Sequence, residues 1–142
     1  MNLQLGNILL MYATTVVVFF VIDLFWLGLA AKELYEKTIG GFLKEQVNWT
    51  AALLFYSIYI GGMQVFVLAP ALQGGSGLVR TAVMGGLLGM FAYSTFDLTC
   101  LALFRNWPIS ITVIDIAWGT LLTGITSAAV LWIVRNIYHF TA

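Results

Sequence analysis

The chain has 142 residues, of which 61% are hydrophobic and 8% are charged, and its mean hydropathy is +0.98. A water-soluble surface does not tolerate so few charges, so the sequence predicts an integral membrane protein. The formal net charge is zero, and no basic patch of the kind that neutralises nucleic-acid phosphates is present. The composition therefore argues against nucleic acid as a partner and makes membrane lipids the expected surroundings.

Four apolar stretches are long enough to cross a bilayer. A hydrocarbon core of about 30 Å requires a helix of about 20 residues. The predicted helices cover residues 8–31, 49–68, 78–104 and 111–134. The sequence thus predicts an all-α fold, a four-helix transmembrane bundle that forms a single integral membrane domain over residues 1–142.

The connections between these helices are short. Residues 32–46 hold three lysines and three glutamates among apolar residues, which suits a short amphipathic piece on the membrane surface. Pro70 and the glycine-rich run 73–77 are predicted to end the second helix, because proline cannot continue the hydrogen-bond ladder. Ser110 is the predicted N-cap of the fourth helix.

Four spans place both termini on one side of the membrane. Lysine and arginine are more frequent in the first and third loops than near the termini and the second loop, which hold Arg80 and Arg135. Positively charged loops tend to stay in the cytoplasm, so this bias places both termini on the extracytoplasmic side.

All three aspartates lie inside predicted spans, where an unpaired carboxylate costs several kcal/mol. At about 1.5 Å per residue, Asp23 and Asp97 lie roughly 12–13 Å before the charged ends of their helices. Asp115 and Tyr56 lie roughly 10–12 Å after the starts of theirs. Each helix thus offers one polar side chain at a common level, which predicts one site.

Helical spacing adds further side chains to this level. The motif Asp-x-x-Trp occurs twice, at residues 23–26 and 115–118. Because residues three apart share a helix face, each tryptophan is expected to point the same way as its aspartate. Gly85 and Gly89 form a Gly-x-x-x-Gly packing face, expected to let the second and third helices approach each other together with Gly61 and Gly62. The predicted ligand- and proton-binding residues are Asp23, Asp97, Asp115, Tyr56, Tyr59, Tyr93, Trp26 and Trp118.

Acids beside aromatic faces bind organic cations through charge and the ring quadrupole. Three carboxylates in one apolar layer cannot all be ionised cheaply. We expect Asp115, near a helix N-terminus, to stay ionised, and Asp23 and Asp97 to carry protons. The sequence thus favours a site for a small cationic or amphipathic ligand, with proton-coupled transport. The cavity of four helices is small, which leaves a homodimer as one way to enclose the substrate.

Other functions remain open. An intramembrane enzyme would use one aspartic acid as general acid and another as base on a lipid or prenyl substrate. No catalytic residue is assigned for it. Metal chemistry ranks third, restricted to hard ions such as magnesium, manganese or calcium, and no metal or cofactor is predicted. Alternatively, the aspartates only hydrogen-bond across helices as structural glue.

The chain resembles a family of uncharacterised small bacterial membrane proteins, grouped as domain of unknown function 2177. The similarity lies in Ile-Asp-Leu-Phe-Trp-Leu-Gly, Tyr-Ile-Gly-Gly, Pro-Ala-Leu, Tyr-Ser-Thr-Phe-Asp-Leu-Thr, Trp-Pro and Ile-Asp-Ile-Ala-Trp-Gly-Thr, at residues 22–28, 59–62, 70–72, 93–99, 107–108 and 114–120. The resemblance implies a four-helix protein of the bacterial inner membrane. It brings no established activity.

Overall fold

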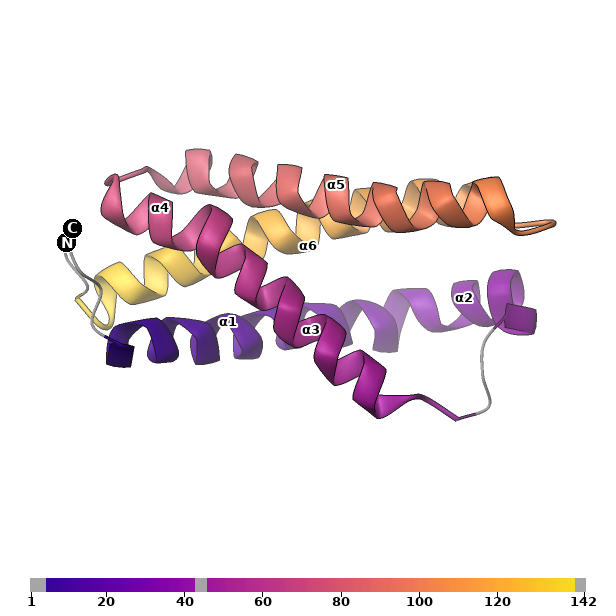
Figure 1. Cartoon of the computed structure of the whole chain (residues 1–142), viewed down its shortest axis with the longest axis horizontal. Helices are drawn as coiled ribbons and strands as arrows, with labels where there is room; N and C mark the ends of the chain where they lie inside the picture. The colour runs from indigo at the N-terminus through magenta and orange to yellow at the C-terminus, as the bar shows by residue number, and fades with distance from the viewer. Residues whose placement is uncertain (1–4, 43–45, 140–142) are drawn as a thin grey trace.

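The computed structural model describes residues 5–42 and 46–139, which are helical apart from short turns and contain no strand. Four helical segments are long and apolar enough to cross a membrane: Leu5–Leu29, Trp49–Gln73, Leu78–Leu103 and Ile109–Asn136. The predicted four-helix transmembrane fold is confirmed. The start of the first segment and the end of the last lie at the same end of the molecule (Figure 1).

The helix of the first span continues well beyond residue 31. Figure 1 shows its last part, α2, following the line of α1 instead of turning across it. Residues 32–39 contain no glycine or proline, and Lys37 and Glu33 form an i,i+4 ion pair at 3.0 Å, which supports a helix. Its elements are α1 (Leu5–Trp26), the π turn η1 (Leu27–Ala31), α2 (Lys32–Ile39) and the 3₁₀ turn η2 (Gly40–Phe42). The amphipathic segment therefore continues the helix of the first span beyond Leu29. Leu43, Lys44 and Glu45 lie outside the described residues.

The second span also differs from its predicted end at residue 68. It consists of α3 (Trp49–Met63), the π turn η3 (Gln64–Leu68) and α4 (Ala69–Gln73). Pro70 lies in the first turn of α4, where a missing N–H is tolerated, and the preceding π turn has already changed the hydrogen-bond ladder. Gly75, with a positive φ of 62°, belongs to the turn that follows.

The third and fourth spans are single helices, α5 (Leu78–Leu103) and α6 (Ile109–Asn136). Pro108, not Ser110, is the N-cap of α6. Proline suits this place because its backbone needs no N–H there and its fixed φ leads into the helix. Ser110 lies one residue inside the first turn, so the predicted cap was wrong by two positions.

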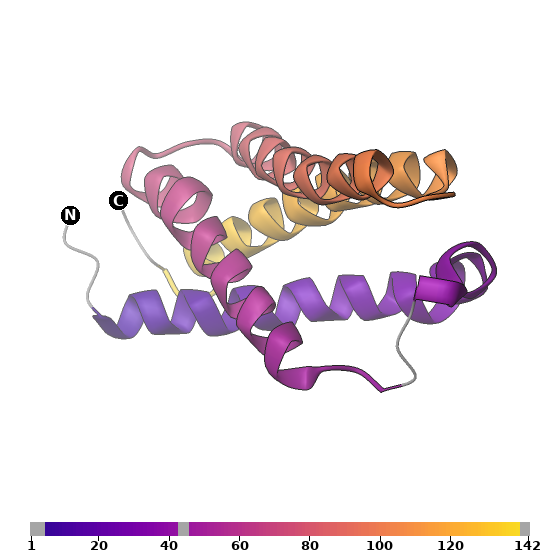
Figure 2. The ribbon, with the colours of Figure 1, turned by 45° about the vertical axis from the view of Figure 1, so that its right-hand side comes forward.

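The helices α5 and α6 form the closest pair, running side by side in both ribbon views (Figures 1 and 2). A Cβ added at Gly85 would lie 2.8 Å from the Thr123 carbonyl oxygen, and one added at Gly124 would lie 2.9 Å from that of Ala82. A Cβ at Gly61 would meet nothing within 4 Å. The glycines therefore join the third and fourth spans, and the expectation that they join the second and third was wrong.

The remaining two spans pack less tightly. Figure 2 shows α3 crossing α1 obliquely, so that α3 diverges from α5 towards its own N-terminus. Phe19, Tyr59, Met63 and Leu122 form a buried cluster where α1, α3 and α6 meet. This oblique crossing determines where the interior is open.

Candidate functional site

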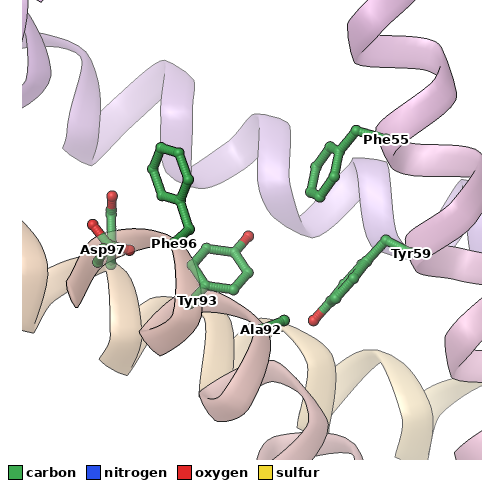
Figure 3. A pocket seen from close by; sticks show the side chains of 7 residues that line it. Phe55, Tyr59, Ala92, Tyr93, Phe96 and Asp97 are labelled. Carbon is green, nitrogen blue, oxygen red and sulfur yellow. The ribbon is translucent and has the colours of Figure 1, made fainter. Parts of the chain in front are cut away.

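A cavity of about 390 Å³ lies between α3, α5 and α6. Figure 3 shows two aromatic side chains from α3 on one side and the residues of α5 on the other. We call it the acidic cavity, and its lining residues are Phe55, Tyr59, Ala92, Tyr93, Phe96, Asp97 and Asp115. It combines four aromatic rings with two carboxyl groups.

Asp97 is fully buried, with 0% of its surface exposed. Neither of its carboxylate oxygens accepts a hydrogen bond from any of the described residues. Buried polar groups almost always have a partner, and an unpaired carboxylate at membrane depth is expensive. Asp97 therefore has two acceptor oxygens that a ligand or a proton can satisfy.

Asp115 differs from Asp97 because it has a protein donor. Tyr35, on α2, donates a hydrogen bond from its hydroxyl to Asp115 Oδ1. This contact exists because α2 continues the first span alongside the start of α6. Tyr35 is a site residue that the sequence does not predict, because an ideal α-helix turns it about 120° away from Asp23 over twelve residues. The π turn η1 between them adds a residue to one turn and brings the two side chains closer to one face.

Asp23 does not line the acidic cavity, but its two oxygens join three spans. Its Oδ1 accepts a hydrogen bond from Trp118 Nε1 at 3.2 Å, and its Oδ2 accepts one from the Tyr56 hydroxyl at 3.4 Å. Trp118 also stacks on Trp26, with ring centroids 4.5 Å apart and planes 13° apart. Asp23 thus hydrogen-bonds to two other spans, whereas Asp97 makes no such bond to the described residues.

The tyrosines of the cavity are held from α6. The hydroxyls of Tyr59 and Thr123 are 2.6 Å apart. Tyr93 lies directly on Gly119, where an added Cβ would be 2.6 Å from Tyr93 Cε2. Gly119 was not predicted, although it directly follows the second Asp-x-x-Trp motif.

The structure thus divides the eight predicted site residues into two connected groups. Asp97, Asp115, Tyr59 and Tyr93 line the acidic cavity, while Asp23, Tyr56, Trp26 and Trp118 form the adjoining hydrogen-bonded and stacked group. Sequence reasoning missed the aromatic walls Phe55 and Phe96, because phenylalanine in an apolar run carries no signal that separates a cavity wall from a lipid-facing side chain. Within the described ranges, no group of three His, Cys, Asp or Glu is placed to hold a metal ion.

Four apolar spans enclosing buried carboxyl groups define an integral membrane protein with a polar interior. A family model described as predicted membrane protein (DUF2177) matches residues 8–132, and the chain belongs to this family. The resemblance seen in the sequence motifs is therefore confirmed. No curated protein and no solved structure matches the chain.

Proposed function

We propose that the acidic cavity binds a small amphipathic cation and exchanges it for protons, as in a proton-coupled transporter of a bacterial inner membrane with both termini outside. The observation that carries this proposal is the unpaired state of Asp97, whose buried oxygens find no donor among the described side chains and backbone. A cationic nitrogen beside Asp97 would supply the missing charge and hydrogen-bond partner.

The walls of the cavity suit the apolar part of such a ligand. Aromatic rings attract cations through their faces and also pack against hydrocarbon. Phe55 and Phe96 are 49% and 61% exposed on the outer surface of the spans. A ligand that partitions into the bilayer can therefore reach the cavity sideways, which favours an amphipathic ligand over a strongly hydrated one.

Coupling to protons follows from the two carboxyl groups. A carboxyl group at membrane depth is neutral when protonated and needs a cation when ionised. Proton and ligand therefore compete for Asp97 and Asp115. Asp23, which joins Trp118 and Tyr56, keeps the neighbouring spans in place while Asp97 and Asp115 change state.

Benzyltrimethylammonium tests the proposal, because its positive charge does not titrate and its ring matches the aromatic walls. Its affinity for the purified protein in detergent, measured by calorimetry, is expected to rise with pH as the cavity acids ionise. Asp97→Asn is expected to lower the affinity about tenfold and to flatten the pH dependence, because the quaternary ammonium, which has no N–H donor, loses the opposite charge that attracts it in a site shielded from water.

Two controls test whether binding depends on the positive charge of the ligand and on the position of the carboxylate in the cavity. Neopentylbenzene, in which carbon replaces the nitrogen, should bind without pH dependence. Glu36→Gln removes an exposed carboxylate from α2 and should change nothing. If folded Asp97→Asn bound benzyltrimethylammonium as tightly as the wild type does, the proposal would be wrong. If Asp97→Asn changed only the thermal stability of the protein, Asp97 would have a structural role between helices instead.

An intramembrane enzyme is the second candidate, because the same cavity holds two carboxyl groups in different hydrogen-bonding surroundings, one paired with Tyr35 and one unpaired. Groups with differing environments are typical of acid–base pairs. An enzyme would act on a lipid or prenyl chain entering from the bilayer. Cells lacking the protein would then accumulate one defined lipid, and expression of Asp97→Asn or Asp115→Asn in these cells would not lower its amount. The purified protein would not bind benzyltrimethylammonium.

A further inference from the structure

A second cavity, of about 210 Å³, lies at the opposite end of α5, where the second span turns into the third. We call it the arginine cavity. Its polar wall includes Ser76, Arg80 and Thr81, and its apolar wall includes Phe66, Val67 and Met84. One side of the cavity is therefore suited to an anion and the other to hydrocarbon.

Arg80 carries a positive charge that no described acidic residue balances. The ion pair found between described residues joins Lys37 and Glu33, at the other end of the molecule. Asp97, the acid on the same helix, lies roughly 25 Å away along the helix axis. Arg80 makes no hydrogen bond to the described residues either, so its five N–H donors are available.

Arg135 has a different task at the same end. Its Nη1 donates to the Ser76 carbonyl oxygen at 2.8 Å and its Nη2 to that of Ala71 at 3.1 Å. These two bonds hold the turn that forms the cavity wall. The positive charge of Arg135 adds to that of Arg80, so the field at the arginine cavity favours an anion.

The depth of the cavity indicates which anion it meets. Arg80 is the third residue of a membrane span, Leu78–Leu103, and span ends lie at the level of the lipid headgroups. Guanidinium groups bind phosphate through two parallel hydrogen bonds. No side chain of the described residues caps the N-terminus of α5, so its first backbone N–H groups add to the attraction.

We propose that the arginine cavity binds the phosphate of an anionic phospholipid. Arg80 pairs with the phosphate oxygens, and an acyl chain of the same lipid packs along Phe66 and Met84. This inference does not depend on the function of the acidic cavity. The shared chemistry is the phosphate group, and the apolar wall favours a lipid over free phosphate.

Native mass spectrometry of the purified protein with dioleoyl phosphatidylglycerol tests the proposal. Arg80→Gln is expected to lower the affinity about tenfold, because a charge-assisted bidentate pair is lost. Arg105→Gln removes the same charge at the other end of α5 and is the matched control, expected to bind like the wild type. Arg80→Lys keeps the charge but loses the two-pronged geometry, and should fall between these.

The ligand controls identify the source of the phosphate. Dioleoylglycerol, with the same chains and no phosphate, should bind more weakly and equally to the wild type and Arg80→Gln. Inorganic phosphate should not displace the lipid at equal concentration; if it did, the site would be one for free phosphate and the lipid assignment would be wrong. Equal losses in Arg80→Gln and Arg105→Gln would also overturn the proposal, because they would reflect net charge alone.

Discussion

The contact between α5 and α6 at Gly89 gives the sharpest test of the fold. A Cβ added at Gly89 would lie 2.6 Å from Thr123 Oγ1 and 2.8 Å from the carbonyl carbon of Gly119. Because the second of these atoms is backbone, Gly89→Ala forces the two helices apart, and overpacking of this kind costs about 1–3 kcal/mol. The matched control is Gly61→Ala, where a Cβ would meet nothing within 4 Å.

Both substitutions gain the same helix propensity, up to about 1 kcal/mol, so their difference isolates the contact. Reversible unfolding in mixed micelles with increasing dodecyl sulfate measures the free energy of unfolding of each variant. We expect Gly89→Ala to be less stable than Gly61→Ala by about 1–3 kcal/mol. Equal stabilities would refute the packing of α5 on α6 through Gly89, and with it the placement of Asp97 beside Asp115.

Two further substitutions test the polar contacts around the acidic cavity. Trp118→Phe removes the N–H donor to Asp23 and should lower the free energy of unfolding by about 1–3 kcal/mol in the same assay. Asp23→Asn keeps an oxygen acceptor for the indole and should lower the free energy of unfolding by less. The reverse order of the two variants would contradict the assigned hydrogen bond. Tyr35→Phe removes the hydroxyl that donates to Asp115 and favours its ionised form, so a proton competes better there and the affinity for benzyltrimethylammonium should fall on the order of tenfold. An unchanged affinity would show that the Tyr35 hydroxyl does not govern the charge of Asp115.

The parts of the structure that the sequence predicts are those set by hydropathy and helix rise. Span number follows from apolar length, and the shared depth of polar residues follows from 1.5 Å per residue. The structure places Asp97 and Asp115 in one cavity and connects Asp23 to Tyr56 and Trp118. Depth and face are periodic properties of the chain, so they can be read from spacing.

Other features depend on forces that spacing does not encode. Hydropathy marks where a span leaves the apolar layer, but the helix itself ends only where backbone hydrogen bonding ends, so Tyr35 was missed. From sequence Pro70 predicts the end of the second helix, because the π turn that precedes it has no sequence signature. Gly85 and Gly89 predict a close helix contact, but which helix they contact depends on complementary small residues across the interface, such as Gly119 and Gly124.

The three aspartates differ in hydrogen bonding, and this difference is the main support for the proposed binding role of Asp97 over a purely structural one. Asp23 has two donors, Asp115 has one, and Asp97 has none among the described residues. Glue requires a partner, because a polar side chain stabilises a membrane bundle only through the bond it makes. An apolar residue would pack at position 97 at lower cost than an unpaired acid. Among the described residues Asp97 lacks the partner that a structural role requires, and this supports the proposed binding of a proton or a cation.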